Sequence, residues 1–163
     1  MKTPTTRPTV LVVDDAFENL IVMEAILADD YTLKLISDAQ EALDYAFATP
    51  PDLILLDIMM PDIDGIEVCR RLKADPKFDD VPVIFITAKN EVEDEELGFA
   101  VGAADFVHKP ISAPVLSARV RTHLKVKFML DYLKNENSRL QESAASEMEN
   151  MQKMFWGGHL LKR

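Results

Sequence analysis

Short apolar runs alternate with amphipathic segments along the first two thirds of this chain. The apolar runs have the length of strands and occupy 9–14, 32–36, 53–57, 81–87 and 105–108. The segment 17–28 has helical spacing, with a predicted buried face of Leu20, Ile21, Met23, Ile26 and Leu27. Strands that alternate with helices in this way predict a parallel sheet that is covered by helices on both faces.

Capping and turn residues mark the other helices of this part. Asp38 is the predicted N-cap of a helix that includes Ala42, Leu43 and Phe47 and ends before a pair of prolines. The turn sequence 61–65 leads into the next helix. A further helix is predicted over about 90–101, where Gly102 ends it.

Two of the apolar runs end in acidic residues. Residues 53–56 are an uninterrupted series of Leu and Ile, as in strands that are buried on both faces, and Asp57 follows directly. The first run ends in the pair Asp14 and Asp15. The most economical fold is a flavodoxin-like, doubly wound sheet with strand order 2-1-3-4-5. In that order the carboxyl ends of the first and third strands are neighbours, so the three aspartates are expected in one cleft.

Two more polar residues end strands at the same edge of this sheet. Thr87 is the last residue of the fourth run, and Lys109 follows the fifth. Taken one at a time, Asp14, Asp15 and Thr87 could cap helices, and Lys109 could be a solvated surface charge. Three clustered carboxylates repel one another unless a cation lies between them, and a site with oxygen ligands only suits Mg²⁺.

Together, these residues resemble the receiver domain of two-component response regulators. The resemblance covers roughly residues 9–125, and it rests on Asp14-Asp15, Leu53-Ile-Leu-Leu-Asp57, Met60-Pro61, Gly65, Thr87-Ala88 and Lys109-Pro110. It implies that Asp57 accepts a phosphoryl group from a histidine kinase or a histidine phosphotransfer protein. It also implies that Asp15, Asp57 and the backbone carbonyl of Met59 bind Mg²⁺ directly, while Asp14 acts mainly through a bound water.

The resemblance assigns further roles to Lys109 and Thr87. Lys109 would pair with Asp57 at rest and with a phosphate oxygen after the transfer. The hydroxyl of Thr87 would then donate a hydrogen bond to the phosphate. The peptide bond before Pro110 is expected to be cis.

Three other positions are singled out by the same resemblance. Phe106 occupies the place of an aromatic side chain on the fifth strand, which turns inward in the activated family members. Met59 and Lys89 occupy places where side chains vary in the family. These places lie near the path of the water that attacks the phosphoryl group during dephosphorylation. We expect these two side chains to affect the lifetime of the phosphate rather than its acceptance.

The last third of the chain is predicted to form one long helix. From Ala113 to about residue 155 no glycine or proline follows Pro114, which corresponds to about 60 Å of helix. One heptad position holds Leu130, Asn137, Ala144 and Met151, and the other holds Val126, Leu133, Leu140, Glu147 and Met154. This pattern predicts a parallel coiled-coil dimer, weakest near its distal end. The alternative is an amphipathic helix that folds back on its own domain.

Composition and charge support a division into a domain at 1–125 and a helical extension with a short tail at 126–163. The 163 residues are 48% hydrophobic, enough for one core. Residues 1–112 hold 9 Lys and Arg against 23 Asp and Glu, a net charge of −14, whereas residues 113–163 hold 9 against 5, a net charge of +4. The basic residues are spread along a helix without interleaved aromatics, so direct nucleic-acid binding is not indicated.

The remaining composition excludes several other classes of protein. A single cysteine, Cys69, excludes an internal disulfide framework. No apolar stretch is long enough to span a membrane, and aspartates interrupt the first apolar run where a secretory signal would continue. We therefore expect a soluble, cytoplasmic protein.

The main hypothesis is a signalling switch that accepts phosphate on Asp57 with Mg²⁺ and reports through dimerisation of its C-terminal helix. In this view it is not an enzyme, and its only chemistry is its own phosphorylation and dephosphorylation. One alternative is a constitutive dimerisation adaptor with a vestigial pocket. Another is a Mg²⁺-dependent phosphatase with an aspartyl-phosphate intermediate, but that reaction needs an acid two residues after the nucleophile, where Met59 stands.

Overall fold

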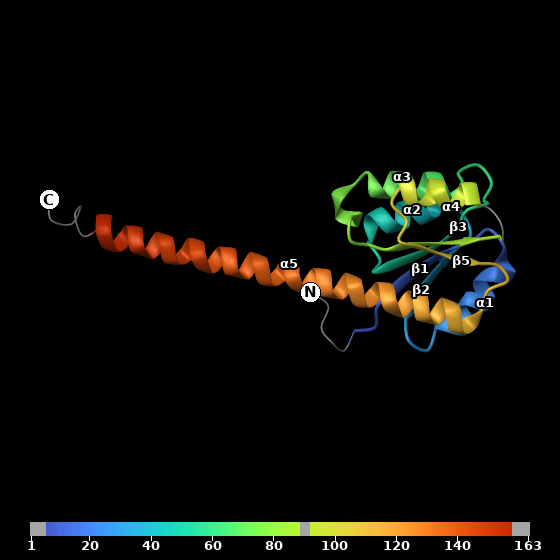
Figure 1. Cartoon of the computed structure of the whole chain (residues 1–163), viewed down its shortest axis with the longest axis horizontal. Coiled ribbons are helices and arrows are strands. Elements are labelled where there is room, and N and C mark those ends of the chain that lie inside the picture. Colours follow the sequence, from blue (N-terminus) through green and yellow to red (C-terminus); the bar gives the residue numbers. More distant parts are fainter. Residues whose placement is uncertain (1–5, 89–91, 158–163) are drawn as a thin grey trace. The chain divides into compact units, whose positions relative to one another are not determined.

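A computed structural model describes residues 6–88 and 92–157 of the chain (Figure 1). The strands are β1 (Thr9–Val13), β2 (Thr32–Ile36), β3 (Leu53–Asp57), β4 (Val83–Thr87) and β5 (Asp105–His108). The α-helices are α1 (Phe17–Leu27), α2 (Ala39–Ala48), α3 (Gly65–Lys73), α4 (Val92–Ala100) and α5 (Ala113–Gln152). Two short helical turns, η1 (Pro76–Phe78) and η2 (Lys153–Gly157), complete the described elements.

The five strands form one parallel sheet in the order β2-β1-β3-β4-β5, which confirms the predicted flavodoxin-like fold. Helices cover both of its faces (Figure 1). Because β3 and β4 lie inside the sheet, every residue of these two strands is buried. This explains why their sequences are continuous apolar runs rather than alternating ones.

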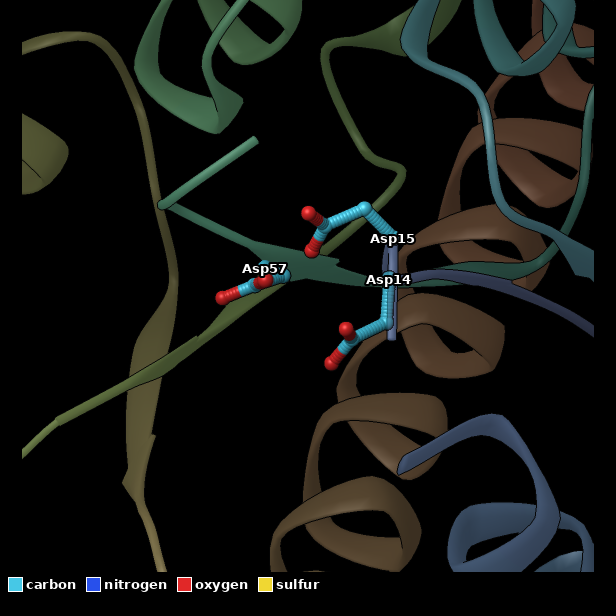
Figure 2. A group of neighbouring side chains, drawn as sticks. All are labelled: Asp14, Asp15 and Asp57. Atoms are coloured by element: carbon cyan, nitrogen blue, oxygen red, sulfur yellow. The ribbon is translucent and has the colours of Figure 1, made fainter. Parts of the chain in front are cut away.

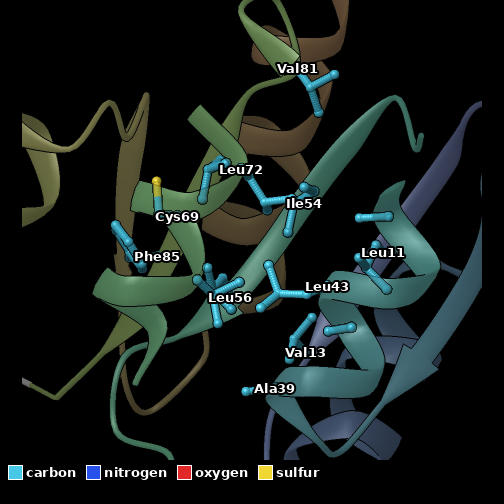
Figure 3. Close-up of a cluster of buried hydrophobic side chains, with 14 of the residues drawn as sticks. Leu11, Val13, Ala39, Leu43, Ile54, Leu56, Cys69, Leu72, Val81 and Phe85 are labelled. Carbon is cyan, nitrogen blue, oxygen red and sulfur yellow. The ribbon is translucent and has the colours of Figure 1, made fainter. Parts of the chain in front are cut away.

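Alternate residues of each inner strand point to opposite faces and build two separate cores. On one face Leu11, Ile54 and Leu56 pack against α2 and α3, and the buried Cys69 lies in the same cluster (Figure 3). On the other face Val12 and Leu55 pack against α1 and the first turns of α5. The sheet is therefore fixed from both sides, and its carboxyl-terminal edge is held in place.

Local signals explain where the helices begin and end. The Asp38 side chain caps α2 as predicted, since it accepts a hydrogen bond of 2.8 Å from the backbone of Glu41. Asp64 caps α3 in the same way. Gly102 follows α4 with a φ of 107°, a conformation that favours glycine. The Lys109–Pro110 peptide bond is cis, as the resemblance implied.

Several sequence-based expectations need correction. Ile21 does not belong to the buried face of α1, because its side chain is 51% exposed, whereas Leu20, Met23 and Leu27 are buried. The fourth strand begins at Val83 rather than at residue 81. The turn η1 was not predicted, although Asp75 caps it. The fourth helix is described only from Val92 onward, so the start expected near residue 90 lies outside the described residues.

The chain separates into two compact units, Met1–Lys127 and Phe128–Arg163. The described part of the second unit consists of the C-terminal part of α5 and the π-helical turn η2. Its exposed large apolar residues are Phe128, Met129, Leu130, Tyr132, Leu133, Leu140, Met148, Met151, Met154 and Phe155. No described helix combines the length and apolar character that a membrane span requires.

The central strand β3 gives a direct test of the core. Replacing Leu55, which is fully buried, by Ala should lower the free energy of unfolding by about 3 kcal/mol, because it opens a cavity between β3 and α1. The same substitution at Leu97, which is 54% exposed on α4, should cost no more than about 0.5 kcal/mol. Urea unfolding measures both variants, and equal losses would contradict this description of the core.

Candidate functional site

The three aspartates that follow the first and third strands meet at one edge of the sheet. Asp14 comes directly after β1, Asp57 ends β3, and the two strands are neighbours in parallel register. One oxygen from each of Asp14, Asp15 and Asp57 lies within 4.8 Å of the other two (Figure 2). The structure therefore brings these three carboxylates together in one acidic cluster, as the strand order predicts.

The immediate surroundings orient the Asp14 carboxylate and leave room for the backbone of Asp57. Asp14 Oδ1 accepts a hydrogen bond of 2.9 Å from the backbone of Ala16, which orders the turn into α1. Asp14 is thus not the N-cap of that helix, a place that Ala16 takes. At Gly65, which begins α3, an added Cβ would overlap the carbonyl oxygen of Asp57. The absence of a side chain there allows α3 to approach the end of β3 closely.

Lys109 brings the positive charge of the site. Its backbone amide donates a hydrogen bond of 2.7 Å to the carbonyl of Thr87, which ties the end of β5 to the end of β4. Its Nζ lies 3.2 Å from Asp57 Oδ1 and 3.8 Å from Asp14 Oδ2. One ammonium group thus faces three carboxylates, so the described cluster keeps an excess of negative charge.

Burial and this excess of negative charge both act on the pKa of Asp57. Burial raises the pKa of the Asp57 carboxyl to about 6 from an ordinary 3.8, and the nearby charge of Asp14 adds to the rise. The contacts with Lys109 lower the pKa of Asp57, but they do not outweigh burial and the charges of Asp14 and Asp15. A second cation in the cleft would favour the ionised form of this group.

The residues of the cleft fit a Mg²⁺ ion. The Oδ2 atom of Asp14 is buried and accepts no hydrogen bond from the described residues, so it is available as a ligand or as an acceptor for a bound water. The three carboxylates supply the hard oxygen atoms that Mg²⁺ prefers. Receiver domains typically bind Mg²⁺ at an acidic pocket of this kind.

The other predicted site residues lie around the cleft. Thr87 is buried at the end of β4, and its hydroxyl donates a hydrogen bond of 3.4 Å to the carbonyl of Ala88. Met59 follows β3 by two residues, and its side chain is 67% exposed. Lys89, which we expect to affect phosphate lifetime, lies outside the described residues.

Phe106 turns inward from β5 and is buried beside two other aromatic rings. Its ring centroid lies 5.5 Å from that of Phe85 and 4.8 Å from that of Phe99. Gly98 on α4 was not singled out from the sequence, yet an added Cβ there would overlap the Phe106 ring. Its only signal in the sequence is a glycine in the middle of a helical pattern, which usually has a packing reason.

The fold and the site together define a class of protein: doubly wound domains that carry an acidic cleft and a lysine at the carboxyl edge of the sheet. The family model for the response regulator receiver domain matches residues 10–121. The chain therefore belongs to the response regulator receiver domain family, as the resemblance predicted.

Two relatives with similar sequences agree with this assignment. The chain is 42% identical to a "Probable cyclic di-GMP phosphodiesterase" of Vibrio cholerae over 147 residues, which cover 88% of this chain and 33% of that protein. It is also 42% identical to the response regulator PleD of Caulobacter vibrioides over 130 residues, covering 79% of this chain and 29% of that protein. The chain thus spans about a third of the length of these relatives.

A solved structure with the same fold is that of the chemotaxis response regulator CheY4 of Vibrio cholerae. It superposes with a TM-score of 0.69 at 27% sequence identity and covers 72% of this chain and 99% of CheY4. Receiver domains take phosphoryl groups from histidine kinases or phosphotransfer proteins, and they are generally non-enzymatic regulators.

Because three carboxylates are crowded together, neutralising Asp57 should stabilise the folded protein in the absence of metal. Without metal at about pH 7.5, Asp57→Asn should raise the free energy of unfolding by roughly 1 to 2 kcal/mol, because it removes a buried charge that the fold disfavours. The pKa of Asp57 is higher in the folded state than in the unfolded one. The wild type should therefore gain stability relative to the variant as the pH falls through about 6.

Excess Mg²⁺ should reverse this order, since an ion that binds the folded wild type stabilises it by mass action. Urea unfolding with a chelator and with Mg²⁺ measures both effects. Asp29→Asn, at an exposed position on the surface, is the control and should show neither. A metal-free Asp57→Asn protein that is less stable than the wild type at every pH would contradict the prediction.

Proposed function

We propose that this chain is a phosphorylation-dependent switch in which Asp57 is the phosphoacceptor. The observation that carries the proposal is that Asp57, at the end of β3, lies close to both the acidic pair and the Lys109 ammonium. In the transfer, a carboxylate oxygen of Asp57 forms a bond to phosphorus, and the bond from phosphorus to the histidine nitrogen of the donor breaks. The donor is a histidine kinase or a histidine phosphotransfer protein.

The other residues of the cleft stabilise charge during this step. Asp15, Asp57 and the carbonyl of Met59 would hold Mg²⁺ directly, with Asp14 acting mainly through a bound water. When bound, Mg²⁺ neutralises the phosphoryl oxygens as they approach the anionic nucleophile. Lys109 Nζ, 3.2 Å from Asp57, can move its hydrogen bond to a phosphate oxygen.

The response to phosphorylation involves Thr87 and Phe106. Within the described residues, the Thr87 hydroxyl donates one long hydrogen bond, to the Ala88 carbonyl at 3.4 Å, so little is lost when it turns to a phosphate oxygen. Phe106 has no hydroxyl, and its ring is held by Phe85 and Phe99. Its contribution to the switch therefore rests on packing alone.

The phosphatase and adaptor alternatives are less well supported. Met59 cannot act as an acid or base, and it stands where a phosphatase with an aspartyl intermediate needs one. A vestigial pocket gives no reason to keep three carboxylates and a lysine together at a cost in stability.

A small phosphodonor such as acetyl phosphate tests the phosphoacceptor. With Mg²⁺, intact-protein mass spectrometry should detect one added phosphoryl group on the wild type and on the exposed-site control Asp29→Asn. The adduct should be absent from Asp57→Asn, because an amide is not a nucleophile toward phosphorus. An equal adduct on Asp57→Asn would remove Asp57 from its proposed role.

We further propose that the helical extension joins two copies of the chain and leads toward an effector. The match to the Vibrio cholerae phosphodiesterase covers 88% of this chain and so continues beyond residues 10–121 of the family model. The extension exposes apolar side chains at heptad spacing, among them Leu133 and Leu140, which are 58% and 62% exposed. A second identical helix in parallel would cover them and would pair Asn137 with its own copy.

Light scattering tests this dimer on the whole chain. Leu133→Glu should weaken dimerisation about 100-fold or more, because two carboxylates would replace a buried leucine pair. The control Ser138→Glu adds the same charge on the outer face of the same helix and should leave the molar mass at that of a dimer. A wild type that remains monomeric at high concentration would reject the proposed dimer.

A further inference from the structure

The distal part of α5 does not fit an unbroken heptad. Continued from Leu140, the heptad pattern places Glu147 and then Met154 in the seam. It leaves Met148 and Phe155, which are 65% and 70% exposed, beside the seam. A pair of carboxylates facing each other in a parallel dimer would be both desolvated and mutually repelling.

We propose that the paired helices contain a stutter between Leu140 and Met148. A stutter is an insertion of four residues into the heptad pattern, and here it moves Glu147 out of the interface. This inference rests on the proposed dimer. After Leu140, successive interface residues are four, four, three and four positions apart. The distal interface residues are therefore Ala144, Met148, Met151 and Phe155. The occupant of this face is a second copy of the chain, in parallel and in register.

The stutter exchanges a poor set of interface residues for a better one. Ala144 and Met151 face the partner in both arrangements. The stutter replaces Glu147 with Met148 and Met154 with Phe155, so no charged side chain remains in the interface from Leu130 to Phe155. The residues involved are helical, up to Gln152 in α5 and through the π-helical turn η2 beyond it.

Asn137 indicates that the partner of this helix face is a second copy of the chain. This amide lies between Leu133 and Leu140 in the interface, where it needs a partner that both donates and accepts a hydrogen bond. The same amide on a second copy meets that need when the two helices are parallel and unstaggered. An antiparallel or shifted pair would place Asn137 against apolar side chains and leave it unsatisfied.

The outer face is compatible with this arrangement. Glu149 and Lys153 form an ion pair of 3.2 Å along the helix, and both positions point away from the partner in the stuttered pattern. From Asn137 to Met148 the interface repeats after eleven residues, which corresponds to about 3.67 residues per turn. The supercoil is therefore expected to unwind locally around Ala144, where the small side chain lets the helices approach closely.

Disulfide formation between cysteine variants of the full-length chain distinguishes the two arrangements. The wild type is the blank, because its single cysteine, Cys69, is buried. Under mild oxidation, Leu140→Cys and Met148→Cys should give cross-linked dimers about ten times faster than Glu147→Cys and the outer-face control Glu142→Cys. The reason is that interface positions bring their Cα atoms within disulfide range, whereas flanking and outer positions do not.

The outcomes separate the stutter from the dimer on which it rests. Rapid cross-linking of Leu140→Cys and Glu147→Cys, with slow cross-linking of Met148→Cys, would overturn the stutter and leave the parallel dimer standing. Slow cross-linking of Leu140→Cys, at the rate of Glu142→Cys, would overturn both.

A second pair of variants measures the same difference without cysteines. Met148→Glu should weaken dimerisation at least about tenfold, because it buries a carboxylate pair, while Glu147→Met should change it less than about twofold. A strong gain in dimerisation from Glu147→Met, with no loss from Met148→Glu, would overturn the stutter.

Discussion

The repulsion among three carboxylates at one edge of the sheet is the constraint on which the site depends. Asp14, Asp15 and Asp57 are brought together by the pairing of β1 with β3, and among the described residues the Lys109 ammonium pairs with Asp14 and Asp57. Burial first, and then the charge of Asp14, raise the pKa of Asp57, so both disfavour its ionised form in the folded chain. The two apolar cores provide the compensating stability, since they fix the strands from both faces. An acidic cluster of this kind offers the oxygen ligands that a small divalent cation prefers.

Much of this arrangement could be predicted from the sequence, because buried parallel strands have a recognisable pattern of apolar residues. A strand that is buried on both faces is a short apolar run, and the residue after it must lie at the carboxyl edge of the sheet. The positions of Asp14, Asp57 and Lys109 follow from that rule alone. The roles of these residues in phosphotransfer came from the resemblance to receiver domains and are not contained in the spacing.

The sequence-based predictions are wrong or incomplete where tertiary contacts decide the burial of a residue or the bounds of an element. Ile21 has a helical spacing that suits a buried face, but α1 turns a narrower stripe to the sheet and leaves this side chain 51% exposed. Val81 and Pro82 were assigned to the fourth strand by their apolar character, yet the strand begins at Val83. Gly98 was missed because its importance lies in a neighbour, the Phe106 ring, that is remote in the sequence.

The contact between Gly98 and Phe106 also bears on how such a domain could be retuned. The tip of the Phe106 ring and a methyl group at position 98 would occupy the same volume, so Gly98→Ala would displace this ring. A single methyl on α4 can therefore set the resting position of a side chain on β5. In the proposed switch, a mutation at position 98 would adjust the balance between two forms at a distance from the acidic cluster, with Asp57 and its neighbours left intact.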